Sequence, residues 1–110
     1  MIRIKVLLYP HGCLRATEAA GHAEAGGRGE DIVCAAVTVL LRTAAQTLAG
    51  LKELALEGQA GQEGQLSFSL PEPPADRREY VRGVTDCLVR GLEELSVEYP
   101  ANIKLEVRKD

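Results

Sequence analysis

The fold is decided by the stretch Ile32-Val-Cys-Ala-Ala-Val-Thr-Val-Leu-Leu-Arg-Thr-Ala-Ala-Gln-Thr-Leu48. Its apolar residues run almost all the way round a helix, which is typical of a helix buried on most sides. Asp31 stands directly before it, and aspartate is a favoured N-cap residue. Gly50 follows, and glycine commonly ends a helix. We therefore predict a buried helix that is capped by Asp31 and ends at Gly50.

The residues before this helix predict a hairpin and a loop. Residues 2–8 alternate apolar with charged side chains, the pattern of a half-buried strand. The Pro and Gly content of residues 9–12 indicates a turn, and residues 13–20 are expected to form the second strand. Residues 21–30 contain four glycines and are expected to form a mobile lid.

After the first helix, residues 66–70 alternate clearly and predict a strand, with 54–56 as its expected partner across a tip at 58–64. Residues 51–56 could equally extend the first helix. Asp76 is expected to cap a second helix that ends before Pro100. Its predicted apolar stripe comprises Tyr80, Val81, Val84, Leu88, Leu92 and Leu95. Residues 103–107 alternate again and predict a final strand.

The order of these elements, β-β-α-β-β-α-β, predicts one α+β domain over residues 1–110. Two helices are expected to pack on a mostly antiparallel sheet. A length of 110 residues suits a single core, and no linker divides the chain.

Composition excludes several classes of protein. A net charge of -3 argues against binding to a nucleic-acid backbone. We expect no membrane-spanning stretch, and the charged start of the chain is unlike a secretory signal. Three cysteines form no disulfide framework and favour a reducing cytoplasm. We expect Cys87 in the core and Cys13 in a strand.

The chemistry is carried by His22 and Cys34, which stand on either side of the glycine-rich loop. If the loop reverses direction, His22 lies beside the start of the helix, with Cys34 in its first turn. The helix N-terminus and an imidazolium would both favour a thiolate there, and free backbone N–H groups of the same turn would suit an oxyanion. Asp31 is assigned to capping and positioning, with orientation of His22 as an alternative role.

Three other interpretations stay open on the residues alone. Cys34 is equally well explained as a buried core residue. His11, Cys13, His22 and Cys34 supply four potential zinc ligands, although their spacing matches no zinc module. A thiol redox sensor would need a resolving cysteine, and Cys13 is the candidate.

Two motifs, Gly21-His22-Ala23 and Gly29-x-Asp31-Ile-Val-Cys-Ala-Ala-Val37, resemble the Prp family of bacterial cysteine proteases that trim a ribosomal protein. The resemblance implies Cys34 as the nucleophile and His22 as the general base and then the acid. It places Gly21, Ala23 and Thr38 near the substrate pocket; the family commonly has serine at the last of these positions.

The same resemblance implies the partners. The substrate would be the N-terminal extension of a large-subunit ribosomal protein, and the enzyme would be a cytoplasmic homodimer without a metal or organic cofactor. The alternative is a ribosome-associated binding module that has kept the fold without catalysis.

Overall fold

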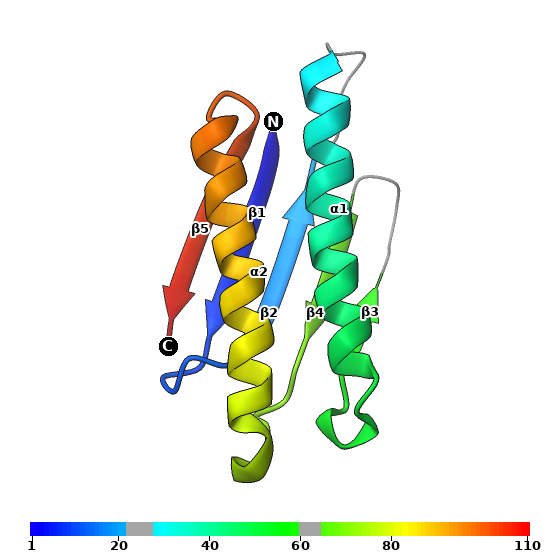
Figure 1. The fold of residues 1–110 in the computed structure, drawn as a ribbon, viewed down its shortest axis with the longest axis vertical. Coiled ribbons are helices and arrows are strands. Elements are labelled where there is room, and N and C mark those ends of the chain that lie inside the picture. Colours follow the sequence, from blue (N-terminus) through cyan, green and yellow to red (C-terminus); the bar gives the residue numbers. More distant parts are fainter. Residues whose placement is uncertain (22–27, 60–64) are drawn as a thin grey trace.

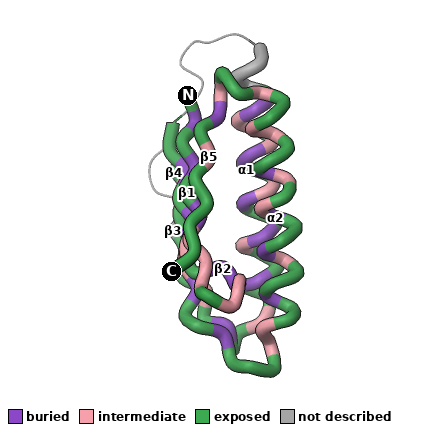
Figure 2. The backbone as a smooth tube through the Cα atoms, turned by 90° about the vertical axis from the view of Figure 1, so that its left-hand side faces the viewer, coloured by how far each residue is buried: buried purple, intermediate pink, exposed green. Residues whose placement is uncertain are grey.

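The molecule consists of two layers, a five-stranded sheet and a pair of helices that cover one of its faces (Figures 1 and 2). The structure is a computed structural model that describes residues 1–21, 28–59 and 65–110, without the side chains of 28–31 and 59. The strands are β1 (Ile2–Leu8), β2 (Leu14–Ala20), β3 (Glu57–Gln59), β4 (Gln65–Ser69) and β5 (Ile103–Lys109). The helices are α1 (Arg28–Ala49) and α2 (Arg78–Glu98), with short 3-10 turns at Lys52–Leu54 and Ala75–Arg77.

The strand order is β3-β4-β2-β1-β5. All neighbouring strands are antiparallel except β1 and β5, which are parallel. The predicted α+β architecture with a mostly antiparallel sheet is therefore confirmed. The C-terminal end of β2 and the start of α1 lie toward the same end of the molecule (Figure 1).

The core lies between the two layers, where buried residues of the strands face those of the helices (Figure 2). The sheet contributes Ile2, Ile4, Val6, Leu14, Ala19, Phe68 and Ile103, and the helices contribute Val33, Val37, Leu41, Ala44, Leu48, Val81, Leu88 and Leu92. Thr85 is buried among them. Its hydroxyl donates to the Val81 carbonyl at 2.7 Å and accepts from the Leu14 N–H at 3.0 Å. The buried hydroxyl is therefore fully hydrogen-bonded.

Helix α1 starts at Arg28, three residues before the predicted cap. Asp31 is thus a helical residue of the first turn and not the N-cap, and Cys34 is in the second turn. An acidic residue suits the first turn because the helix dipole is positive there. The predicted loop 21–30 is correspondingly shorter: residues 28–30 are helical, and 22–27 lie outside the described residues.

The prediction that α1 is buried on most sides was wrong. Ile32 is 58% exposed and Val39 is 62% exposed. By length and apolarity the segment Ile32–Ala49 would also suffice to cross a membrane, contrary to our expectation. Its inward row, however, which includes Val37 and Leu41, packs in the core of this domain, as expected for a helix that covers a sheet.

Three further local predictions were wrong. The partner of β4 is Glu57–Gln59, because residues 52–54 form a 3-10 turn anchored by the buried Leu54. Asp76 does not cap α2, since the chain enters this helix through a 3-10 turn and the N-cap position is Arg77. Tyr80 is 45% exposed and does not belong to the core.

Two glycines of α2 provide a matched test of the helix packing. A Cβ at the exposed Gly83 would meet no atom within 4 Å, whereas a Cβ at Gly91 would lie 3.1 Å from Leu40 of α1. Glycine costs a helix interior about 1 kcal/mol relative to alanine. We expect Gly83→Ala to raise the free energy of unfolding by about that amount, and Gly91→Ala to gain less or to destabilise. Equal gains in urea denaturation would contradict the close contact between the helices.

Candidate active site

Cys34 lies in the second turn of α1, half-buried against the core, and its thiol is free. Leu40 on the same helix faces α2, since a Cβ at Gly91 of α2 would lie 3.1 Å from its side chain. Six residues separate the two positions, so Cys34 points about 120° away from Leu40 around the helix axis. Cys34 is therefore on the flank of α1 that looks away from α2, over the β4 side of the sheet (Figure 1).

Thr38 follows Cys34 by one turn on the same flank and is exposed. Gly21 directly follows β2 and has φ +111°, a backbone conformation that side chains rarely adopt. A Cβ at this position would run into the Met1 carbonyl oxygen. Glycine is thus required where the chain leaves the sheet beside its own N-terminus.

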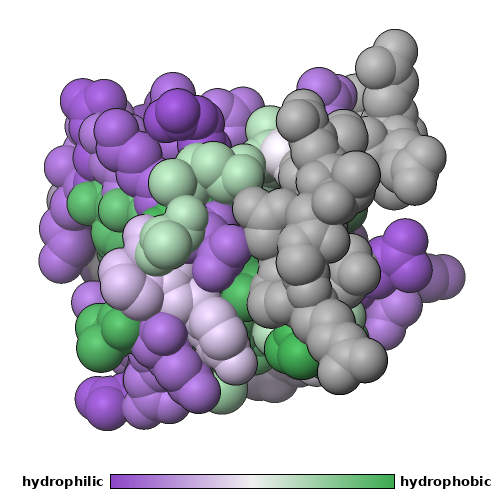
Figure 3. All heavy atoms as spheres, turned by 90° about the horizontal axis from the view of Figure 1, so that it is seen from above, coloured by the Kyte–Doolittle hydropathy of each residue, from purple (hydrophilic) through white to green (hydrophobic). Residues whose placement is uncertain are grey.

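The structure brings together only part of the predicted site. Gly21 lies toward the end of the sheet where α1 starts, and Cys34 and Thr38 line one flank of that helix. Asp31 is placed by its backbone, in the first turn. His22 and Ala23 lie outside the described residues. Viewed from above, hydrophilic and hydrophobic side chains are intermixed on this end of the molecule (Figure 3).

The longer helix changes the electrostatics expected at Cys34. The first four N–H groups of a helix lack intrahelical acceptors, and the dipole effect falls off within the first turn. In a helix that starts at Arg28, these free N–H groups belong to the start of the first turn, before Asp31. The free N–H groups at the start of α1 therefore precede Cys34 by about one turn, whereas the sequence predicted them beside it.

Cys13 and Cys87 differ from Cys34 in their surroundings. Cys13 is fully buried just before β2, and its Sγ–H donates to the Arg78 carbonyl at 3.4 Å. Cys87 is exposed, so its predicted place in the core was wrong. Cys34 alone combines partial burial with a place near the start of a long helix.

A disulfide between Cys13 and Cys34 is excluded by the fold. Cys13 contacts Arg78 at the start of α2, and Gly91 of α2 lies opposite Leu40. Because the two helices are antiparallel, Arg78 and Cys34 lie on opposite sides of this contact along the helix axes. At a rise of about 1.5 Å per residue, the two cysteines are roughly 28 Å apart. A disulfide needs Cα atoms within about 7 Å. Cys13 is therefore not a resolving cysteine for Cys34, and the redox-sensor hypothesis loses its partner.

Burial raises the pKa of the Cys13 thiol from its ordinary value of 9.0. The folded protein thus holds this proton more tightly than the unfolded chain does. The contribution of the buried thiol to the free energy of unfolding is therefore complete below pH 9 and is lost as the pH rises further. Burial likewise raises the pKa of Tyr9 above 10.0, which adds to the loss at higher pH. We expect the free energy of unfolding to fall above pH 9, and Cys13→Val to flatten this fall between pH 9 and 10. An unchanged slope in the variant would exclude Cys13 as its source.

The zinc hypothesis finds no support among the described residues, which contain no group of three potential metal ligands. The Nδ1 of His11 accepts from the Cys13 N–H at 3.4 Å, and its Nε2 lies 3.3 Å from Glu72 Oε1. An Arg78 Nη2–H donates to the same carboxylate oxygen at 3.4 Å. His11 thus ties the turn between β1 and β2 to the segment before α2.

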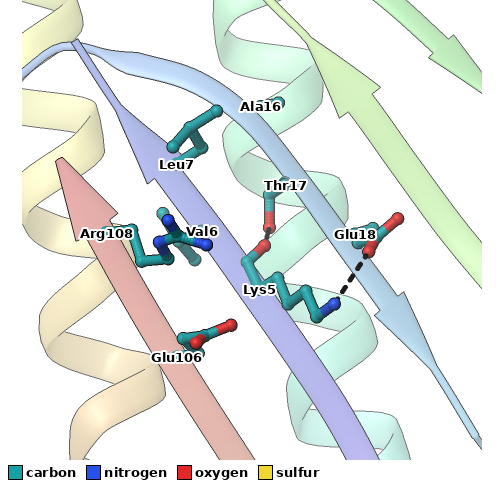
Figure 4. Close-up of a pocket in the computed structure, with 8 residues that line it drawn as sticks. All are labelled: Lys5, Val6, Leu7, Ala16, Thr17, Glu18, Glu106 and Arg108. Carbon is teal, nitrogen blue, oxygen red and sulfur yellow. Dashed lines mark hydrogen bonds and ion pairs between the residues drawn. The ribbon is translucent and has the colours of Figure 1, made fainter. Parts of the chain in front are cut away.

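A pocket on the other face of the sheet is separate from Cys34. It is lined by Lys5, Val6, Leu7, Ala16, Thr17, Glu18, Glu106 and Arg108 (Figure 4). Lys5 Nζ lies 4.0 Å from Glu18 Oε1, and both side chains are mostly exposed. The lining combines these exposed charged side chains with the apolar Val6, Leu7 and Ala16, and it contains no cysteine.

Comparison with known proteins agrees with the fold. The chain is similar over its full length to SMU.848 from Streptococcus mutans, with 25% identity, a TM-score of 0.80 and 96% of that chain covered. It is also similar to the essential ribosomal processing protease Prp from S. aureus, solved with a substrate peptide. That match has 20% identity and a TM-score of 0.81, covering 97% of this chain and 99% of the other.

A second structure of the S. aureus protein, with a covalently linked product peptide, matches at 22% identity and a TM-score of 0.79 over the same shares of the two chains. No curated protein matches the chain. The family model described as cysteine protease Prp matches residues 1–104. This chain therefore belongs to the cysteine protease Prp family.

Proposed function

We propose that this protein is a cysteine endopeptidase that removes the N-terminal extension of a large-subunit ribosomal protein. Cys34 is the nucleophile and His22 the general base. The observation that carries the proposal is the free, half-buried Cys34 thiol near the start of α1. Gly21, the residue before His22, directly follows β2 and lies toward the same end of the molecule. Membership of a cysteine protease family supports it.

The proposed reaction has two steps. His22 takes the proton from the Cys34 Sγ, and the thiolate attacks the carbonyl carbon of the scissile peptide bond. The resulting imidazolium then protonates the leaving amine as the C–N bond breaks, which leaves an acyl thioester on Cys34. In the second step His22 deprotonates a water molecule, which hydrolyses the thioester and regenerates the thiol.

Other residues have supporting roles in this proposal. Gly21 and Ala23 flank His22, and Thr38 borders the substrate one turn from Cys34, where its methyl group narrows the pocket relative to serine. Asp31 lies in the first turn of α1, so its proposed role is to position its neighbours. Residues 28–30 of the predicted lid belong to α1, so only its remaining part, residues 21–27, stays a prediction.

The proposed setting is the cytoplasm, with the protein as a homodimer that needs no metal or organic cofactor. Direct contact with nucleic acid or a membrane is not expected. The unpaired Cys13, Cys34 and Cys87 support a reducing compartment.

Selective alkylation tests the nucleophile without any knowledge of the substrate. At neutral pH a thiolate reacts far faster than a thiol, so Cys34 should be carboxamidomethylated about tenfold faster than the more exposed Cys87. Cys13 is fully buried and should not react in the folded protein. His22→Ala should remove the advantage of Cys34.

Peptide mapping by mass spectrometry separates the three sites. Cys34 reacting no faster than Cys87 would favour the non-catalytic binding module instead.

A further inference from the structure

One edge of the sheet is long and unpaired. The strand order β3-β4-β2-β1-β5 leaves β3 and β5 at the two edges (Figure 1). Strand β3 has only three residues, and short edge strands offer little to pair with. Strand β5 has seven, and among the described strands it pairs with β1 alone. The side of β5 that points away from β1, called here the β5 outer edge, is therefore open to a further strand.

A hydrogen bond at the end of β5 shows which of its backbone groups reach the outer edge. The Asp110 N–H donates to the Leu8 carbonyl of β1 at 3.0 Å. Backbone groups of successive residues in a strand point to opposite sides, so the even-numbered residues of β5 bond to β1. The N–H and C=O groups of Leu105, Val107 and Lys109 therefore point outward, and no described residue bonds to them.

The side chains along this edge are apolar on one face of the sheet and basic on the other. On the helix side, Leu105 is half-buried and Val107 is 39% exposed. On the open side, Lys104 and Arg108 are exposed, and Arg3 of β1 is the register partner of Lys104. No described residue forms a hydrogen bond or ion pair with these three basic side chains. Since like charges in neighbouring strands repel each other, an acidic neighbour would be favoured here.

Charge also excludes a second copy of the same strand. In an antiparallel pair of β5 strands centred on Glu106, Lys104 would face Arg108 and the two glutamates would face each other. Every such pair consists of like charges, which opposes pairing between identical edges. The phosphates of a nucleic acid would meet the basic side chains but would leave the outward N–H groups and the apolar side chains unused. An acidic strand would use all three features.

We propose that the β5 outer edge binds an extended acidic segment of another protein by strand addition. Hydrogen bonds to the outward backbone groups of β5 supply the affinity, and alternating side chains supply the selectivity. The inference goes beyond the proposed function, because β5 lies at one edge of the sheet and Cys34 lies over the β4 side, toward the other edge.

The side chains of β5 define a probe for this edge. Residues of neighbouring strands pair directly across a sheet, so the added strand needs glutamate opposite Lys104 and Arg108. It needs an uncharged polar residue opposite Glu106 and valine on the helix side. The end-blocked peptide Glu-Val-Thr-Val-Glu meets this pattern in either direction, because it reads the same both ways. We expect a dissociation constant of about 1 mM, since the contact is far smaller than a standard interface.

Amide exchange in the full-length folded protein reports the binding mode. Nitrogen–proton NMR spectra should show that the peptide shifts the outward amides of Leu105 and Val107. At about nine times the dissociation constant, the peptide should slow the exchange of these amides with solvent about tenfold. The amide of Glu106 bonds to β1 and should keep its exchange rate. A peptide held by charge alone would not produce this alternation.

Two proline variants and one charge reversal give matched controls. Val107→Pro removes an outward N–H that the sheet does not use, so it should abolish peptide binding while the protein stays folded. Glu106→Pro removes an N–H that bonds to β1 and should lower the melting temperature instead. Arg108→Glu, which alters no backbone group, should weaken binding of the glutamate peptide about fivefold or more and favour Lys-Val-Thr-Val-Lys.

Three results would overturn the proposal. The first is unchanged exchange of the outward β5 amides in the presence of the glutamate peptide. The second is equal binding of the glutamate and lysine peptides, which would exclude an acidic partner. The third is binding of polyuridylate RNA at Arg3, Lys104 and Arg108 without binding of the peptide, which would assign these side chains to a nucleic acid. Cleavage of the ribosomal substrate is measured separately, and Val107→Pro should leave it unchanged.

Discussion

Replacing Cys34 by serine is expected to lower kcat/KM for peptide cleavage on the order of 10⁴-fold or more, the scale measured when a catalytic nucleophile is removed from a protease. Serine has nearly the same size, so the half-buried site keeps its packing. Its hydroxyl, however, ionises far less readily than a thiol, so His22 would have to remove a much less acidic proton. Initial rates with a peptide that spans the scissile bond measure the effect.

The control for this loss is Cys87→Ser, which removes an exposed thiol on α2. It should leave kcat/KM within a factor of two of the wild type. Equal melting temperatures of the two variants would show that the loss is chemical. A Cys34→Ser protein that keeps a tenth of the activity would exclude this residue as the nucleophile.

Replacing Leu41 by alanine has the largest effect expected on stability. Leu41 is 1% exposed on the inward side of α1, where it packs in the core between the layers. A buried leucine truncated to alanine costs about 3 to 5 kcal/mol, because the transfer energy of the lost atoms is added to that of the cavity. This is a large fraction of the roughly 5 to 15 kcal/mol that holds a domain together.

Urea denaturation measures the change. Val97→Ala, at a position 80% exposed, is the matched control and should change the free energy of unfolding by less than about 0.5 kcal/mol. A loss below 1 kcal/mol for Leu41→Ala would mean that α1 does not pack on the sheet as described.

Local patterns predicted most of the elements, because side-chain periodicity reports which face of a segment is buried. The alternation in residues 2–8 and 103–107 identified β1 and β5 correctly. The parallel pairing of these two strands was not predicted, since a pattern identifies a strand without naming its neighbour. The start of α1 was placed late because Gly29 has low helix propensity, which the rest of the helix outweighs.

The exposure of Ile32 and Val39 marks a limit of a different kind. An apolar residue in a sequence predicts burial, but not whether its own domain or another molecule provides it. The site itself was only partly predictable. The spacing of His22 and Cys34 indicated a nucleophile with its base, and the structure places Cys34 near the start of a long helix. The burial of Cys13 and the exposure of Cys87 depend on tertiary packing that one sequence does not reveal.

The most direct test of the proposed function is the mass of the products when the wild-type protein is incubated with the ribosomal protein that carries its N-terminal extension. His22→Ala and Cys34→Ser serve as parallel samples. We expect a single cut that releases the extension, and no cut with either variant. An intact substrate in the presence of folded wild-type protein with reduced Cys34 would contradict the assignment of this substrate.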